Sequence, residues 1–220
     1  MNKKIINSLI FNIIIFILVT LGTIFMITGY RFMSNTKVLA SGGFESFKFY
    51  TVDSNLFVGV ASFLLIIYEV LFLKGKIKEI PKYVYVIKYV GVVAVLLTFF
   101  VTLLYLAPSY GSNFLFLYQN SNLLFHLIVP ILSFISFVFY EDINLEFKHT
   151  IYGISTMILY GIYYIINLLI HQENGMVEFK YDWYGFVKGG IEYIFIVFPI
   201  ILIITYLISY ITYKIKHKSR

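Results

Sequence analysis

The sequence has no cysteine and few charged residues, and each shortage excludes a class of protein. Without cysteine there is no disulfide framework and no thiolate metal site, and the redox compartment cannot be inferred. Charged residues make up 13% of the chain, whereas hydrophobic residues make up 60% and the mean hydropathy is +0.87. A soluble domain of 220 residues is usually about half apolar or less. The composition therefore predicts an integral membrane protein.

Familiar catalytic and ligand-binding signatures are also missing from the sequence. It contains no GxSxG turn, no P-loop and no glycine-rich dinucleotide turn. Its four histidines show neither HxxxH nor HExxH spacing. We therefore predict no bound metal ion and no cofactor.

Six apolar runs are long enough, or nearly so, to cross a hydrocarbon core of about 30 Å as helices. Helices are expected because a membrane-spanning segment must satisfy its own backbone hydrogen bonds. The sequence thus predicts one all-α domain over residues 1–220, a polytopic bundle of six transmembrane helices. The predicted helices lie near residues 5–27, 44–73, 83–106, 113–139, 151–170 and 190–213.

Lysine and arginine predict how the bundle is oriented in a cell membrane. They are concentrated in the two termini and in the second and fourth loops, at Lys3, Lys4, Lys74, Lys76, Lys78, Lys82, Lys148, Lys214, Lys216, Lys218 and Arg220. The other loops hold fewer, namely Arg31, Lys37, Lys48, Lys180 and Lys188. The positive-inside rule places both termini in the cytoplasm and loops 1, 3 and 5 outside it. Because this bias explains most of the net charge of +6, we expect no nucleic-acid partner.

Two charged residues fall within the predicted helices near their inner ends. We expect Lys88 in the third helix to extend its ammonium group to the membrane interface. We expect Glu69 in the second helix to pair with a lysine of the basic inner loop.

Two short polar motifs that resemble each other stand before apolar helices. Residues 50–56 read YTVDSNL and residues 118–123 read YQNSNL. Asp, Ser and Asn at such positions are typical of helix caps, since their side chains accept hydrogen bonds from the first free N–H groups. Helix length favours a second interpretation, in which the helices begin about two turns earlier, near residues 44 and 113. In that case the polar side chains lie inside the helices and must face the bundle interior or a wet cavity.

Helical spacing then gathers polar side chains on one face of each of these two helices. They are Thr51, Ser54, Asn55 and Ser62 in the second helix and Asn122, His126 and Ser133 in the fourth. A histidine beside a hydroxyl is the minimum needed to activate a Ser or Thr nucleophile. Pro130, four residues after His126, predicts a kink below the imidazole. The alternative is a histidine that only bonds a neighbouring helix.

Two further considerations bear on this candidate site. Glu192, just inside the outer end of the sixth helix, is a candidate to orient His126 or to serve the helix N-terminus. Counted from the inner ends of straight helices, Thr51 lies about 12 Å further out than His126. Unless tilt or the Pro130 kink absorbs this difference, Ser54, one turn deeper, is the better nucleophile.

Three features carry a family resemblance: residues 49–56 (FYTVDSNL), His126 with Pro130, and residues 181–186 (YDWYGF), where Gly185 stands at an expected proline. In these the chain resembles a family of small bacterial six-transmembrane proteins. That family is distantly similar to the androgen-induced protein and androgen-dependent TFPI-regulating protein family of animals, which are intramembrane hydrolases of fatty acid esters of hydroxy fatty acids. The resemblance implies that Thr51 is the nucleophile and His126 its base.

Three hypotheses about function follow. The first is an intramembrane ester hydrolase that acts on membrane lipids or a lipid-like substrate through Thr51 and His126. Its supporting or alternative residues are Ser54, Asn55, Asn122 and Glu192. The second is a non-catalytic membrane-embedded binder of a small molecule or lipid, such as the specificity subunit of a vitamin uptake system. The third is a bundle without a ligand, whose polar residues join its helices.

Overall fold

The computed structural model describes residues 2–35 and 42–219, and in this part of the chain six helices are long and apolar enough to cross a membrane. We call them spans 1 to 6. They comprise Lys3–Thr28, Tyr50–Leu73, Lys82–Ser109, Ser121–Tyr140, His149–Ile170 and Ile191–Lys218. The protein is therefore an α-helical bundle with the lengths and apolarity of an integral membrane protein.

Several spans are built from shorter pieces. Spans 1 and 2 are single helices, α1 (Asn2–Thr28) and α2 (Tyr50–Leu73). Span 3 joins α3 (Lys82–Val101) to α4 (Ala107–Ser109) through a π-helical turn, Thr102–Leu106. Span 4 contains α5 (Ser121–Leu123), a π turn at Leu124–Ile128, α6 (Val129–Ile135) and a π turn at Ser136–Tyr140.

The last two spans flank a long loop. Span 5 contains α7 (His149–Tyr152) and α8 (Ser155–Ile170), so the predicted helix at 151–170 starts earlier and is interrupted after Tyr152. Span 6 is a 3-10 turn, Ile191–Tyr193, followed by α9 (Ile194–Lys218). The loop between them carries a small antiparallel ribbon, β1 (Gln172–Glu173) and β2 (Met176–Val177).

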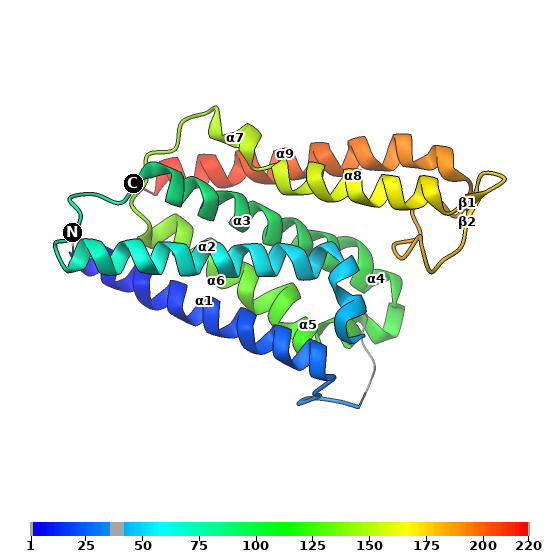
Figure 1. Ribbon diagram of the computed structural model, residues 1–220, viewed down its shortest axis with the longest axis horizontal. Helices are drawn as coiled ribbons and strands as arrows, with labels where there is room; N and C mark the ends of the chain where they lie inside the picture. The colour runs from blue at the N-terminus through cyan, green and yellow to red at the C-terminus, as the bar shows by residue number, and fades with distance from the viewer. Residues whose placement is uncertain (1, 36–41, 220) are drawn as a thin grey trace.

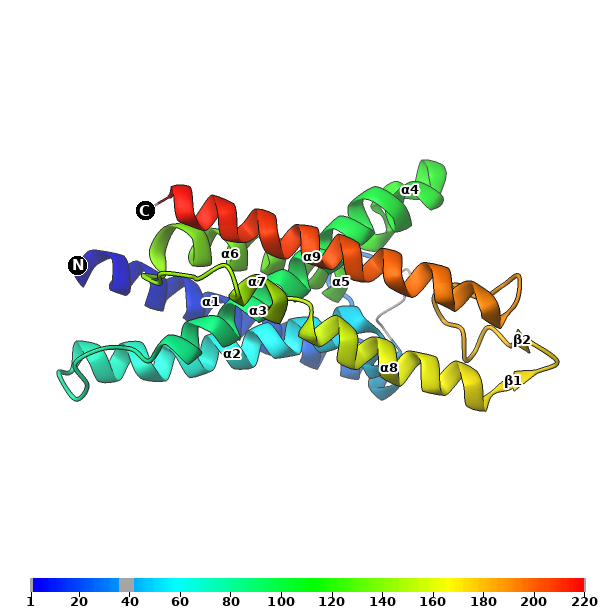
Figure 2. The same ribbon diagram turned by 90° about the horizontal axis from the view of Figure 1, so that it is seen from above.

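The helices are arranged around α3. Of the six spans, span 3 is the most enclosed. In its most apolar stretch of 18 residues 61% are buried, whereas the corresponding share for span 6 is 22%. α1, α2 and span 4 lie on one side of it, and α8 and α9 lie side by side on the other (Figure 1). α8 and α9 extend together past the rest of the bundle at the end that carries β1 and β2 (Figure 2). α3 therefore provides a buried wall for both halves of the bundle.

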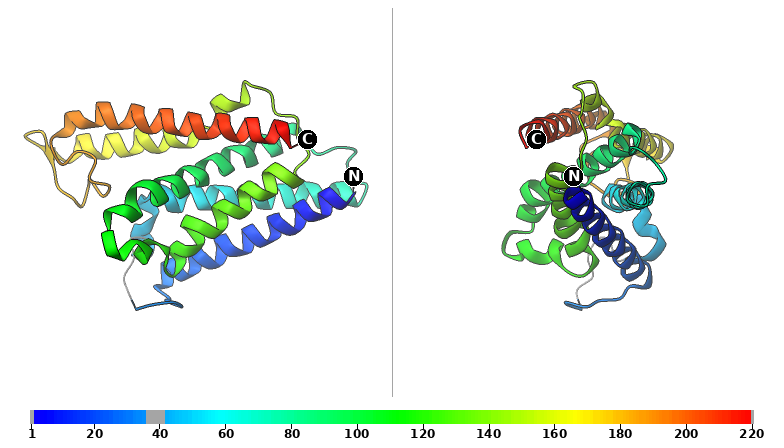
Figure 3. Two further views of the ribbon diagram at one scale, coloured as in Figure 1. Left: turned by 180° about the vertical axis from the view of Figure 1, so that it is seen from behind. Right: turned by 90° about the vertical axis from the view of Figure 1, so that its left-hand side faces the viewer.

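Both ends of the chain lie at the same end of the bundle, as an even number of antiparallel helices requires (Figure 3). The side of the membrane on which they lie remains a prediction from the basic residues. Lys37 and Arg220, which contribute to that prediction, lie outside the described residues.

The predicted continuous helix at 44–73 is wrong at Phe49. A separate 3-10 helix, Gly43–Lys48, ends there, and Phe49 itself has an extended backbone with φ −89° and ψ 131°. α2 therefore begins at Tyr50, and residues 50–56 form its first turns, as the helix-length interpretation predicts. No side chain of the motif itself caps this helix end in the described structure, so the capping interpretation of the motif is wrong for α2.

The predicted continuous helix at 113–139 is wrong at residues 119 and 120. A 3-10 helix, Gly111–Tyr118, ends before Gln119, and Asn120 takes a positive φ of 54°. The Asn120 Oδ1 atom accepts hydrogen bonds of 2.9 Å from the backbone N–H groups of Phe32 and Met33. The second polar motif thus breaks the helix because Asn120 holds the first loop.

Lys88 and Glu69 do not reach the interface. Both are almost fully buried, and Lys88 Nζ donates a hydrogen bond of 2.6 Å to Ser62 Oγ. Glu69 lies near Lys88 and the buried Glu141 rather than near the loop lysines, and forms no ion pair among the described residues. The reason is the central position of α3, which directs Lys88 into the bundle. Both predictions for these residues were therefore wrong.

Candidate functional site

The start of α2 is held by the loop that precedes span 6. The Tyr184 hydroxyl accepts a hydrogen bond of 2.8 Å from the Tyr50 N–H, the first of the free donors at this helix end. Trp183 Nε1 donates to the Tyr160 hydroxyl at 3.1 Å, and that hydroxyl donates to the Lys48 carbonyl at 2.5 Å. The aromatic loop is therefore fixed over the entrance to span 2.

Asp182 gives this loop its shape. Its side chain is 2% exposed and accepts hydrogen bonds from the N–H groups of Phe186 (2.9 Å) and Val187 (3.0 Å) and from the Tyr164 hydroxyl. Gly185 lies between with a φ of +69°, a conformation that the ring of proline cannot adopt. The conformation of the loop thus explains why glycine rather than proline occupies position 185.

The loop covers a cavity that Thr51 and His126 both line. We call this cavity, of about 310 Å³, the polar chamber. Its walls are Phe49, Thr51, Tyr105, Leu106, Ser109, Tyr110, His126, Phe179, Trp183, Tyr184 and Lys188. The offset of about 12 Å expected from straight helices does not keep Thr51 and His126 out of one cavity.

His126 is held in a defined tautomer. Its Nδ1 atom lies 2.8 Å from the Leu117 carbonyl oxygen, and because a carbonyl only accepts, Nδ1 carries the hydrogen. In the neutral imidazole Nε2 is then the proton acceptor, and it has no hydrogen-bond partner among the described residues. The ring is 3% exposed and lies in the π turn that precedes Pro130, where the Val129 N–H donates to the Leu124 carbonyl.

The predicted kink at Pro130 therefore takes the form of a π-helical turn. Such turns widen a helix locally and are frequent at functional sites. Proline lacks an N–H, so the carbonyl one α-helical turn before it has no donor at that position. The π turn is the local adjustment that the sequence makes around this missing donor.

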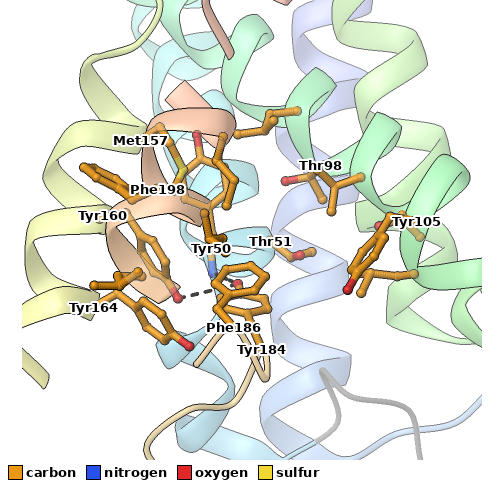
Figure 4. A pocket seen from close by; sticks show the side chains of 18 residues that line it. Tyr50, Thr51, Thr98, Tyr105, Met157, Tyr160, Tyr164, Tyr184, Phe186 and Phe198 are labelled. Atoms are coloured by element: carbon orange, nitrogen blue, oxygen red, sulfur yellow. Dashed lines mark hydrogen bonds between the residues drawn. The ribbon is translucent and has the colours of Figure 1, made fainter. Parts of the chain in front are cut away.

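A second, apolar pocket adjoins the polar chamber at Thr51. The apolar pocket is narrower, with a volume of about 70 Å³, and lies between α2, span 3, α8 and α9. Thr51, Tyr105, Leu106 and Tyr184 line both cavities. In Figure 4 Thr51 lies between the rings of Tyr184 and Phe186 and the ring of Tyr105. A hydroxyl thus stands where an apolar space meets a polar one.

The other predicted residues lie outside both of these cavities. The Ser54 hydroxyl bonds Thr98 Oγ1 and the Thr51 carbonyl, both at 3.1 Å, so Ser54 is not brought to His126. Asn55 Nδ2 donates to the carbonyls of Thr51 (2.7 Å) and Phe125 (3.1 Å) and ties α2 to span 4.

Asn122 and Glu192, the two remaining candidates, differ in burial. Asn122 is fully buried one turn before His126, and neither its Oδ1 nor its Nδ2 has a partner in the described part of the chain. Glu192 is exposed and does not line the chamber. The structure therefore does not bring Glu192 to His126.

Sequence reasoning missed several residues of the chamber. Tyr184 was visible only as part of an aromatic loop, Lys188 only as a loop charge, and Tyr105 only as the end of an apolar run. The Leu117 carbonyl could not have been found, because its role depends on backbone geometry.

No family model matches the chain, and no similar protein was found among curated proteins or among solved structures.

Proposed function

We propose that the protein is an intramembrane ester hydrolase in which Thr51 attacks the substrate carbonyl and His126 acts as general base. The observation that carries this proposal is that Thr51 and His126 line one chamber while Thr51 also lines the adjoining apolar pocket. An ester with its alkyl chain in the apolar pocket and its more polar part in the chamber has its carbonyl group at Thr51. The narrow pocket suits an unbranched chain.

The proposed chemistry follows from the tautomer of His126. Nε2 takes the proton of the Thr51 hydroxyl as Oγ1 bonds to the carbonyl carbon, and the imidazolium then returns that proton to the departing alkoxide. The products of this half-reaction are the alcohol and a Thr51 acyl ester. Water, deprotonated by the same Nε2, hydrolyses the acyl ester and releases the acid.

The helix start supplies stabilisation for the oxyanion. Thr51 is the second residue of α2, so its N–H is one of the N–H groups of the first turn that have no acceptor within the helix. The positive end of the helix dipole lies at the same place. The remote family resemblance assigns the same two residues, and it stands beside this argument as a prediction.

Purified protein with long-chain fluorogenic esters tests the proposal. Thr51→Ala and His126→Gln should each lower turnover by about 100-fold or more, whereas His171→Gln, a loop histidine outside the chamber, should leave it unchanged. Mass spectrometry of a quenched reaction should find the acyl group on the peptide that contains Thr51. Full turnover in both variants, with folding intact, contradicts the assignment.

A non-catalytic lipid binder is the second candidate. It is favoured by the apolar pocket itself. The hydroxyls of Tyr50 and Tyr160, which line this pocket, are already bonded to protein partners, so the pocket can hold an alkyl chain without any reaction. Retention of a fatty acid or ester by wild-type protein, without turnover and without an acylated Thr51, supports this candidate over the hydrolase.

A further inference from the structure

A third cavity, which the proposed reaction does not use, lies between α2 and α8. We call it the Asp53 groove. Its volume is about 270 Å³, and its walls are Tyr50, Asp53, Ser54, Phe57, Thr156, Leu159, Tyr160 and Tyr163. Leu159 is 69% exposed and Tyr163 is 51% exposed, so the groove opens at the outer surface of the bundle. In a membrane-spanning bundle this surface faces lipid near the end where α2 begins.

Asp53 places an unpaired carboxylate in this groove. The side chain is half-buried, and it forms no hydrogen bond or ion pair with any residue that the structure describes. It does not cap α2, whose first N–H is bonded by Tyr184 instead. A partly buried charge without a partner is costly, above all beside lipid. This is notable in a chain with 17 lysines and arginines and only 11 acidic residues.

Apart from the exposed hydroxyl of Tyr163, the other polar side chains of the groove are already engaged. The Tyr50 hydroxyl and Thr156 Oγ1 bond each other at 2.9 Å, and the Tyr160 hydroxyl donates to the Lys48 carbonyl. Ser54 Oγ is bonded to Thr98 and to the Thr51 carbonyl. What remains for a ligand is the Asp53 carboxylate, the Tyr163 hydroxyl and the faces of aromatic rings.

The ionisable groups that face Asp53 from both helices are aromatic. Tyr50 on α2, Tyr160 on α8 and Tyr184 in the loop lie within electrostatic range of the carboxylate, and all three are neutral hydroxyls near pH 7. No lysine or arginine acts on it within the described structure. The field in the groove is therefore negative and has no internal counter-ion.

We propose that the Asp53 groove binds an organic ammonium cation, with Asp53 as its counter-ion and the rings of Tyr50, Phe57 and Tyr163 around its alkyl groups. Aromatic faces attract such cations, and the attraction grows when the site is sheltered from water. The groove suits Ca²⁺ less well, because Ca²⁺ takes six to eight oxygen ligands and the wall offers a single free carboxylate. The ammonium group belongs either to a free amine or to the headgroup of a zwitterionic phospholipid, both of which reach an opening at the lipid surface.

Binding of choline to the full-length protein in a non-ionic detergent tests the charge requirement. Calorimetric titration should show saturable binding of choline and at least about tenfold weaker binding of its neutral tert-butyl analogue. Asp53→Asn should lower choline affinity by about tenfold, and Tyr163→Leu, which alters an exposed ring, should lower it severalfold. Glu45→Gln removes an exposed carboxylate shortly before α2, outside the groove, and should change nothing.

Nanodiscs distinguish the two sources of the cation. If the occupant is a lipid headgroup, native mass spectrometry should show phosphatidylcholine or phosphatidylethanolamine retained over phosphatidylglycerol, and Asp53→Asn should abolish the preference. If the occupant is a free amine, choline should bind to the protein in phosphatidylglycerol nanodiscs as tightly as it does in detergent. The proposal is overturned if choline and its neutral analogue bind alike and no zwitterionic lipid is preferred, or if correctly folded Asp53→Asn retains wild-type affinity and preference.

Discussion

The Tyr184 hydroxyl oxygen accepts a hydrogen bond of 2.8 Å from the backbone N–H of Tyr50, 134 residues earlier in the chain. The loop before span 6 thus caps span 2 from outside, and the polar residues that follow Tyr50 are free for other roles. Thr51 faces two cavities, Ser54 binds α3 through Thr98, and Asn55 binds span 4 through Phe125. One tertiary contact therefore fixes the start of the helix that carries the candidate nucleophile.

Tyr184→Phe should destabilise the protein by about 1 kcal/mol, because it leaves the Tyr50 N–H without its acceptor. The change is measured as a lower midpoint of thermal unfolding in detergent. Tyr193→Phe is a matched control, since Tyr193 is 48% exposed and lies shortly after the same loop. If the two variants unfold at the same temperature, the Tyr184 hydroxyl does not stabilise α2.

Gly161→Ala should narrow the apolar pocket. A Cβ atom at position 161 would lie 1.9 Å from Cε2 of Phe198, so the ring of Phe198 must move, and both residues line the pocket. Binding or turnover of long-chain esters should fall by about tenfold or more, while short-chain esters should be affected less. Ile162→Ala, on the exposed side of α8, should leave the chain-length profile unchanged. An unchanged profile in the Gly161 variant would place the alkyl chain elsewhere.

The six helices follow from the sequence because each is a long apolar run, whereas their interruptions do not. Phe49 and Asn120 break two predicted helices, and nothing in the local sequence around them forbids a continuous helix. Asn120 holds the backbone of Phe32 and Met33, and the helix after Phe49 is capped by Tyr184. Contacts between residues far apart in the chain decide these positions, so local patterns cannot reveal them.

The candidate site was predictable to a similar extent. Polar spacing singled out Thr51 and His126, and both line one chamber. The same spacing also singled out Ser54, which is turned to Thr98, and position near a helix end singled out Glu192, which is exposed. Spacing shows which residues share a helix face, but the rotation of each helix against its neighbours decides which cavity that face lines.

Lys88→Met should destabilise the protein by roughly 1 to 3 kcal/mol, because it removes a buried hydrogen bond to Ser62 and an ammonium group near two buried acids. Lys88 is fully buried and acts electrostatically on both Glu69 and Glu141, and an Oε2 atom of each carboxyl group already lacks a partner in the described structure. Removing the ammonium leaves Glu69 without the cation that acts on it, whereas Glu141 keeps Lys216, so adding Glu69→Gln to the variant should restore part of the loss. The comparison uses denaturation in detergent, with the exposed Lys78→Met as control. Wild-type stability in Lys88→Met would show that the acids do not depend on Lys88.

Glu146 should make a small contribution to stability that depends on pH and salt. Its exposed carboxylate bridges Lys82 and Lys148, with 2.8 Å between Lys148 Nζ and Oε2. These hydrogen bonds lower the pKa of Glu146 to about 2, whereas the unfolded chain has a glutamate pKa of about 4.3. Because the folded pKa is the lower one, the contribution is fully present above about pH 4.3 and disappears as the pH falls toward about 2.

Thermal unfolding of Glu146→Gln against wild type, followed from neutral to acidic pH, measures this contribution. The variant should unfold at a slightly lower temperature near pH 7, and the difference should vanish at the acidic end because the wild-type carboxyl group is then protonated. Added salt should shrink the difference at neutral pH, since both lysines and the carboxylate are exposed to solvent. Glu173→Gln, an exposed acid in β1 with no ion pair in the described chain, should show neither effect. A difference that persists at the acidic end would mean that the Glu146 side chain stabilises the loop through packing and not through its charge.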